Sequence, residues 1–354
     1  MIRTAECAGC LYILTPVFFE TPSSSKNDVE SDIDVFVDTL KQAPSSLKND
    51  VESDIDLFFS KIFHSTHQQL DAIGALEQRS DAWIESRKLR ITASNFGAIV
   101  GLNPYSSPEK HLLEALFSTF AGNAATEYGS SHEAIACAAY LEGLNGRVCH
   151  RDSGLVISRE MPFLGASPDG IMTANSSTFS THPPIMRCPV VGQPGGSFDL
   201  VKTSYSPELG LSSVCSWTPP ALFPHEFLLE IKCPFRKRLY GKIPDYYYAQ
   251  IQGCMQILDL PYAHFYVWTP FTSSLDCFPR NDDWWHHFAL PKLIDFYFLR
   301  YMPLVYLQSR GQLRGCASTG TAGPDCLLPS DGLCPEYVRR VFAHCALLAL
   351  AFKK

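Results

Sequence analysis

Apolar and polar residues follow two different periods along residues 81–306, and each change of period marks a predicted element. Apolar residues three or four positions apart predict helices at residues 81–87, 92–101, 107–120, 126–141, 245–258 and 282–306. Ser80 or Asp81 is a typical cap for the first of these, and Pro108 suits the first turn of the third. In the fourth helix we expect Ile135, Ala138, Ala139 and Leu141 to face the core.

Shorter apolar runs between these helices predict strands. The clearest runs are residues 226–233 and 263–268, and short strands are expected on both sides of Pro168-Asp169-Gly170. Residues 147–157 predict a β-hairpin, because Asp152-Ser153-Gly154 is a typical turn sequence. Helices interleaved with strands in this way are typical of a compact α/β domain.

The periodic region is flanked and interrupted by stretches of different character. The pattern divides the chain into an acidic extension at 1–78, a domain at 79–306 and a mostly irregular tail with a short helix at 307–354. Within the extension, the acidic sequence at residues 26–34 recurs at residues 48–56 with helical spacing. We interpret the two copies as a duplicated amphipathic helix or as a protein-binding segment. Residues 175–224 are rich in Ser, Thr, Pro and Gly, which predicts a low-order insertion.

Composition changes this picture only slightly. Of the 354 residues, 46% are hydrophobic and 18% are charged, so the chain can bury a sizeable core. The net charge of −7 is unusual for a protein that only coats nucleic acid, but it suits an enzyme with acidic metal ligands. Pro16 interrupts a short apolar run near the start, so we expect neither a signal peptide nor a membrane span. The 13 cysteines are scattered, which is typical of reduced thiols in an intracellular protein, nuclear or cytoplasmic.

The chemistry of the chain centres on Glu230 and Lys232, which alternate with apolar residues near the end of the strand predicted at residues 226–233. A period of two places both charged groups on one face of that strand, where burial costs several kcal/mol unless a partner compensates. Asp169 supplies a second carboxylate beside a tight turn, although a turn aspartate is its plainer interpretation. The two carboxylates and the backbone carbonyl of Ile231 suit Mg²⁺ or Mn²⁺, which prefer oxygen ligands. Lys232 is placed to hold a water or to stabilise charge on a phosphate.

Two further polar residues are candidates for the same site. Glu133 lies on the helix predicted at 126–141, with Gly129 one turn earlier, and its alternative is an exposed helix glutamate. Gln250 and Gln252 lie in an aromatic helix, which suggests hydrogen bonds to a fixed polar centre, although ordinary helix filling explains them equally.

Several motifs in order resemble the YqaJ-type viral recombinase domain, a relative of phage lambda exonuclease in the PD-(D/E)xK, restriction-endonuclease-like superfamily. They span about residues 81–306 and comprise Trp83-x-x-x-Arg87, Ile91-Thr92-Ala93-Ser94, Gly129-x-x-x-Glu133, Ser167-Pro168-Asp169-Gly170, Leu229-Glu230-Ile231-Lys232-Cys233-Pro234, Tyr247-x-Ala249-Gln250-Ile251-Gln252 and Trp268-Thr269-Pro270. The resemblance implies an α/β fold with a central mixed β-sheet flanked by helices, here with a helical N-terminal extension and irregular insertions.

The resemblance also implies a function, namely Mg²⁺-dependent 5′→3′ degradation of double-stranded DNA in recombination or repair. Asp169 and Glu230 would hold the metal, Lys232 would serve the nucleophilic water, and Glu133 and Gln250 would support the site. Arg87, Ser94 and Ser167 would bind the terminal 5′ phosphate. Lambda exonuclease is a trimer, so a homo-oligomer is a further expectation. Three alternatives remain open: an endonuclease, an inactive DNA-binding or recombination scaffold, and an interaction protein whose acidic repeat recruits partners.

Overall fold

The computed structural model describes residues 48–78, 80–117, 122–144, 146, 148–174, 186–187, 199–200, 226–315, 327–329 and 335–353. They belong to two units, of which one comprises Ser65–Ser106 and Phe120–Leu290, and the other comprises Met1–His64, Ser107–Thr119 and Pro291–Lys354. The boundaries of these units differ from those that the sequence pattern suggests at residues 78 and 306. Residues 1–47, which include the first copy of the acidic repeat, lie outside the described residues. The same holds for most of residues 175–224.

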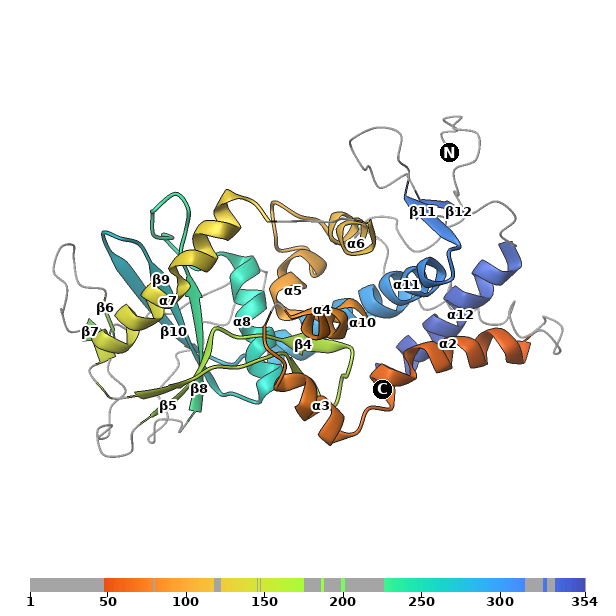
Figure 1. The fold of residues 1–354 in the computed structure, drawn as a ribbon, viewed down its shortest axis with the longest axis horizontal. Helices are drawn as coiled ribbons and strands as arrows, with labels where there is room; N and C mark the ends of the chain where they lie inside the picture. The colour runs from red at the N-terminus through yellow and green to blue at the C-terminus, as the bar shows by residue number, and fades with distance from the viewer. Residues whose placement is uncertain are drawn as a thin grey trace. The chain divides into compact units, whose positions relative to one another are not determined.

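A five-stranded mixed sheet organises the first unit (Figure 1). Strand β8 lies at its centre, antiparallel to β5 and parallel to β9, while β2 and β10 form the edges in antiparallel pairing. The strands are β2 (Val148–Arg151), β5 (Gly170–Ala174), β8 (Glu226–Lys232), β9 (Tyr262–Trp268) and β10 (Ser273–Pro279). The central position explains the nearly continuous apolar run of β8, because both faces of a central strand are covered.

Helices α7 (Ala124–Leu144) and α8 (Asp245–Leu258) cover opposite faces of β8. Alternate residues of β8, including Leu229 and Ile231, pack with α7 in one apolar cluster, whereas Glu230 points to α8. The sequence correctly predicts both helices, and the bounds of α8 agree at both ends.

The predicted inner face of α7 is mostly wrong, although Leu141 does pack against the apolar cluster. Its buried residues are Ala136, Tyr140 and Leu144, whereas Ile135 is 53% exposed, Ala138 is exposed, and Ala139 and Leu141 are only partly buried. The observed stripe has a spacing of four residues and is centred on the large ring of Tyr140. Alanine favours helices at exposed and buried positions alike, so the several alanines do not define which side of this helix faces inward.

The predicted hairpin at residues 147–157 is also wrong. Strand β2 pairs with β5, whereas β3 (Val156–Ile157) pairs with β4 (Leu164–Ala166) in a second sheet that also contains β1 (Ile91–Thr92). A Cβ atom on Gly154 would lie 2.1 Å from the carbonyl oxygen of Gly74, at the end of α3 (His67–Gly74). Gly154 is therefore needed because two backbones approach closely, and the chain passes from one sheet to the other there.

Close packing against α5 (Ala93–Ile99) fixes the position of α8. A Cβ atom on Gly97 would lie 2.5 Å from Cβ of Tyr246, and one on Gly253 would lie 2.3 Å from the Phe96 ring. Gly97 therefore lets α5 approach the backbone of α8, and Gly253 leaves room for the Phe96 ring. Helix α4 (Asp81–Lys88) precedes them, and the Ser80 side chain accepts a hydrogen bond from the backbone N–H of Trp83, as its predicted cap role requires.

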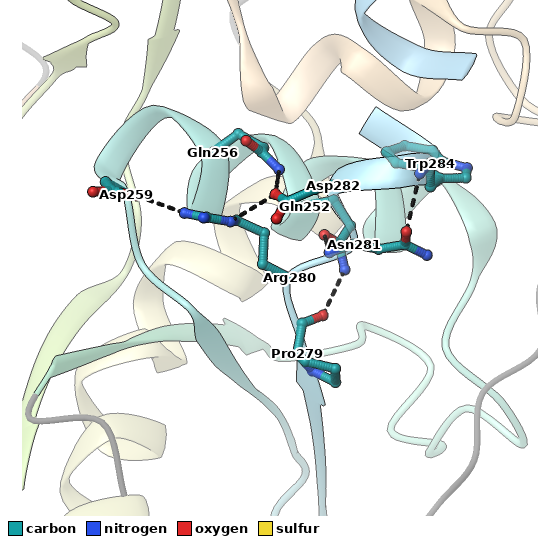
Figure 2. A network of polar contacts seen from close by, with 8 residues as sticks. All are labelled: Gln252, Gln256, Asp259, Pro279, Arg280, Asn281, Asp282 and Trp284. Carbon is teal, nitrogen blue, oxygen red and sulfur yellow. Dashed lines mark hydrogen bonds and ion pairs between the residues drawn. The ribbon is translucent and has the colours of Figure 1, made fainter. Parts of the chain in front are cut away.

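A hydrogen-bonded polar network ties the other end of α8 to the connection after β10 (Figure 2). Gln252 donates to the carbonyl oxygen of Pro279 at 3.0 Å and accepts from the N–H of Asn281 at 2.8 Å. Asn281 in turn caps the short helix α9 (Asp282–Trp284). This polar network, drawn in Figure 2, comprises Gln252, Gln256, Asp259, Pro279, Arg280, Asn281, Asp282 and Trp284.

Helical structure continues from α9 through residues 285–309, broadly as predicted for 282–306, but with two π-helical turns. These elements are η2 (Trp285–Ala289), α10 (Leu290–Phe296), η3 (Tyr297–Tyr301) and α11 (Met302–Ser309).

The second unit is mainly helical. The repeat copy at residues 48–56 lies in α2 (Lys48–Phe63), which runs alongside α12 (Pro335–Phe352) (Figure 1). Rings of Phe63, Phe298 and Phe352 pack together, with Phe298 and Phe352 stacked at 5.0 Å. The remaining elements are α6 (Pro108–Phe117) and the strand pair β11 (Leu313–Gly315) and β12 (Leu327–Pro329).

The structure confirms the predicted fold class, an α/β fold whose central mixed sheet is flanked by helices. A second small strand pair, β6 (Met186–Arg187) with β7 (Asp199–Leu200), is described within the predicted insertion. Among the described helices, none combines the length and the apolar character needed to cross a bilayer.

Candidate functional site

The register of the central sheet brings the two predicted carboxylates together. Gly170 pairs with Leu229 in the antiparallel β5–β8 ladder, so the preceding Asp169 lies beside Glu230. Asp169 Oδ2 accepts a hydrogen bond from the backbone N–H of Ile231 at 2.6 Å. The carboxylate thereby replaces a ladder partner at the point where β5 begins, and this bond fixes its position against β8.

Glu230 is the most enclosed charged group of the site, with a side chain that is 1% exposed. Its Oε1 accepts from Lys232 Nζ at 2.5 Å and from Gln250 Nε2 at 2.5 Å. Its Oε2 is buried without a hydrogen-bond partner among the described residues. A buried, unpaired carboxylate oxygen is costly, so Glu230 is stable here only if something else compensates this atom.

Electrostatics reinforce that conclusion. Burial, with the nearby charge of Asp169, raises the pKa of Glu230 to about 8, although Lys232 opposes this shift. Burial also raises the pKa of Asp169, against the opposing effects of Lys232 and the Ile231 N–H. Burial alone would lower the pKa of Lys232, but the charges of Glu230 and Asp169 raise it above its ordinary value. One ammonium group therefore does not fully balance two enclosed carboxyl groups.

The donor set fits a hard divalent cation. Asp169 and Glu230 supply oxygen atoms, one of which lacks a partner, and Mg²⁺ or Mn²⁺ retains several waters when proteins bind it. Within the described ranges, no three or more His, Cys, Asp or Glu side chains gather closely enough to hold a metal by themselves. A cation here would thus take two carboxylates, with water or the Ile231 carbonyl completing its shell.

Glu133 lies on α7, which covers the other face of the sheet, but its charge reaches the site. It contributes to the raised pKa values of Glu230, Cys137 and Cys233. Its predicted role in placing a metal or a water remains a prediction.

The three predicted phosphate-binding residues also come together. Arg87 donates to Ser167 Oγ at 3.4 Å and to Thr92 Oγ1 at 3.0 Å, and its guanidinium lies 4.2 Å from the centre of the Trp83 ring. Ser94 Oγ lies 3.3 Å from Thr92 Oγ1. Burial lowers the pKa of Arg87 to about 10. Arg87, Ser94 and Ser167 therefore form a cluster of hydrogen-bond donors around Thr92.

Three residues contact the site although the sequence did not predict them as site residues. Thr92 is central to the Arg87 cluster, and its place in the Ile91-Thr92-Ala93-Ser94 motif was the available signal. Tyr247 presents its ring to Lys232, whose Nζ lies 5.0 Å from the ring centre. His150 donates from Nε2 to the carbonyl oxygen of Asp169 at 3.3 Å, which nothing in the sequence pattern indicates. A Cβ on Gly170 would lie 2.5 Å from this imidazole, so Gly170 leaves the space that His150 needs.

Comparisons with known proteins match part of this chain to a described family. Residues 82–260, just over half of the chain, match the family described as the YqaJ-like viral recombinase domain. A curated protein of African swine fever virus is 28% identical over 186 residues, which is 50% of this chain and 45% of the viral protein. The match therefore spans less than half the length of that curated relative.

Solved structures show a weaker likeness. The alkaline exonuclease LHK-Exo from Laribacter hongkongensis covers 66% of this chain with 98% of its own length, at 17% identity and a TM-score of 0.43. The complex of the same bacterial protein with dAMP gives the same coverage and identity, with a TM-score of 0.44.

Proposed function

This chain belongs to the family of YqaJ-like viral recombinase domains, and on that premise we propose that it is a metal-dependent deoxyribonuclease. We further propose that it acts on double-stranded DNA as a 5′→3′ exonuclease in recombination or repair. The supporting observation is the enclosed Glu230 carboxylate, which has one unpartnered oxygen and lies beside Asp169 and Lys232.

The arrangement of this carboxylate favours a cation-binding role over a purely structural one. A structural carboxylate in a protein interior normally has hydrogen bonds to both oxygens. Glu230 has its two donors, Lys232 and Gln250, on the same oxygen. The other oxygen is thus available to a ligand of positive charge, and a divalent cation would also offset the repulsion between Glu230 and Asp169.

Each residue then has a definite task. Asp169 and Glu230 would hold the cation, which when bound supplies a polarised water and neutralises charge on the phosphodiester. The N–H of Ile231 fixes Asp169, and Gln250 fixes Glu230, so both carboxylates are oriented before substrate binds. Lys232 places a positive charge at the same carboxylate, where it would stabilise negative charge that develops on the phosphate.

The Arg87 cluster supports an exonuclease over an endonuclease. A terminal 5′ phosphate carries more negative charge and more free oxygens than an internal phosphodiester. A guanidinium with two neighbouring hydroxyl groups matches such a terminus, because Arg binds phosphate through several N–H donors at once. Ser167 belongs to this cluster and lies two residues before Asp169, which links recognition of an end to the acidic site.

A cleavage assay with the full chain tests this function. The chain should degrade linear 5′-phosphorylated duplex with Mg²⁺, should be inactive with EDTA, and should leave a covalently closed circle intact. Glu230→Gln should lower the rate by about 10³-fold, the scale expected when a group that stabilises transition-state charge is lost.

Glu226→Gln is the matched control, since Glu226 lies on the same strand but is partly exposed and pairs with Arg151 at 3.4 Å. It should retain wild-type activity. A wild-type chain that binds duplex but never cleaves it would support the inactive scaffold instead. Equal activity in Glu230→Gln and Glu226→Gln would also contradict the proposed site.

A further inference from the structure

Four aromatic rings form a continuous row at the C-terminal ends of strands β8 and β9. The Tyr128 and His132 rings are stacked at 3.9 Å on the first turns of α7. Phe235, from the loop after β8, meets Tyr128 edge to face at 5.8 Å, and Trp268, the last residue of β9, lies 5.8 Å from His132. We call Phe235, Tyr128, His132 and Trp268 the aromatic row.

The aromatic row lies on the α7 face of the sheet, at the end of β8 and β9 that also carries Lys232. Lys232 pairs with Val267 in the parallel β8–β9 ladder, so Trp268 follows directly after the partner of Lys232. Phe235 follows Lys232 by three residues, and His132 precedes Glu133 on α7. A nucleic acid strand that crosses the C-terminal ends of β8 and β9 would contact residues that are close in sequence to Glu230 and Glu133.

Positive charge accompanies the rings. The N–H of Lys237 donates to the carbonyl oxygen of Pro234 at 2.8 Å, which closes a tight turn that carries Phe235. Lys237 has a backbone φ of 53°, a conformation that costs a side-chain-bearing residue free energy. Its ammonium lies 6.0 Å from the centre of the Tyr128 ring, and Arg236 and Arg238 are exposed on either side. This turn therefore carries an exposed aromatic ring together with three exposed basic residues.

The rings are held in place and partly accessible. His132 Nδ1 lies 2.9 Å from the carbonyl oxygen of Tyr128, a contact that limits rotation of the imidazole. Phe235 is 52% exposed, so the outer end of the row is open to solvent. Exposed aromatic rings flanked by Lys and Arg are the pattern of surfaces that stack unpaired bases while cations follow the phosphates.

We propose that the aromatic row binds single-stranded DNA by base stacking, with Phe235 as the outermost contact. This proposal deepens the nuclease function and rests on it for the location of the strand beside the acidic site. Paired bases in a duplex expose only their edges, so the aromatic row distinguishes an unpaired strand from an intact duplex. An apolar peptide would use the rings but would leave the three cations of the turn without counter-charges.

Binding in EDTA separates this proposal from cleavage. Fluorescence anisotropy of a labelled oligothymidylate should show that Phe235→Ala raises Kd about tenfold, equivalent to about 1.4 kcal/mol. Phe235→Tyr should bind like the wild type because it keeps the ring. An abasic oligonucleotide of equal length should bind both the wild type and Phe235→Ala with similar, weaker affinity, since it has phosphates but no bases.

Two matched controls test specificity. Phe271→Ala removes another exposed phenyl ring, which contacts no other aromatic ring among the described residues, and should leave Kd unchanged. Lys237→Asn keeps a residue that tolerates positive φ but removes the charge, and should weaken binding of both oligonucleotides about threefold. Lys242→Asn changes an exposed lysine of the same loop and should have no effect.

The outcomes are distinguishable from those of the cleavage assay. A wild type that cleaves duplex, with unchanged oligothymidylate affinity in Phe235→Ala, would overturn base stacking and leave the nuclease intact. Weaker binding in Phe235→Ala together with a wild type that never cleaves would support stacking and overturn the nuclease. Equal losses in Phe235→Ala and Phe271→Ala, or equal losses for abasic and normal DNA, would also overturn stacking.

Discussion

Gln250 and Gln252 lie two residues apart on α8, yet they belong to polar regions of opposite character. Gln252 bonds through both its amide nitrogen and its amide oxygen within the polar network of Figure 2. Gln250 donates to a carboxylate whose other oxygen has no partner in the described part of the chain. In the first region both amide atoms of the buried Gln252 are hydrogen-bonded. In the second region one oxygen of the buried Glu230 carboxylate has no hydrogen-bond partner among the described residues.

The difference teaches how to separate a structural polar group from a functional one. A fully paired buried network stabilises one conformation and needs no ligand. An incomplete one stores a free-energy cost that a ligand can relieve, and proteins retain such costs mainly at functional sites. By this criterion Gln252, with both amide atoms paired, is structural, and the carboxylate that Gln250 contacts marks the proposed binding site.

The same substitution at the two glutamines should have opposite consequences, and the larger effect is expected at Gln252. Gln252→Met keeps the approximate side-chain volume but leaves the carbonyl of Pro279 and the N–H of Asn281, both in partly buried residues, without their partner. We expect a loss of about 3 kcal/mol in the free energy of unfolding, since two unsatisfied groups cost about 1–3 kcal/mol each. Urea denaturation measures it.

Gln256→Met is the control for this change. Gln256 lies one turn later and donates to Asp282, which is largely solvent-exposed, at 2.6 Å. Its loss should cost under about 1 kcal/mol, because water replaces the lost bond. Comparable stability in Gln252→Met and Gln256→Met would refute the structural assignment.

Gln250→Met should instead reduce activity while it leaves folding nearly unchanged. Glu230 Oε1 retains its bond to Lys232 in this variant, so the substitution leaves no further oxygen of Glu230 unpaired. Without the amide, the carboxylate is less well oriented, and we expect a fall in kcat of about 30-fold, or about 2 kcal/mol in the barrier. Cleavage of 5′-phosphorylated duplex at saturating Mg²⁺ measures the effect, and denaturation checks the fold. A variant that loses stability but keeps its kcat would place Gln250 with Gln252 in the structural class.

The sequence specifies much of this comparison but not all of it. The apolar run of β8 and the helical period of residues 245–258 predict the strand and helix, and alternation within β8 predicts that Glu230 and Lys232 share a face. Both glutamines look equivalent in the sequence, because their roles depend on partners 20 to 29 residues away. The side of α7 that faces inward and the pairing of β2 were mispredicted for a related reason, since long-range packing decides them and local pattern does not.

The exposed ion pairs of the polar network should contribute least to the free energy of unfolding. Their removal therefore tests whether the buried Gln252 amide accounts for most of the stabilisation. Arg280 donates to Asp259 at 2.7 Å, but the Asp259 side chain is 92% exposed. Exposed ion pairs typically contribute about 0.2–1 kcal/mol because water and salt screen them. Asp259→Asn should therefore change the free energy of unfolding by less than about 0.5 kcal/mol, and Asn tolerates the left-handed backbone at this position, where φ is 53°. Urea denaturation at low and high salt measures this change. A loss as large as that of Gln252→Met would show that the charges, and not the buried amide, hold α8 to β10.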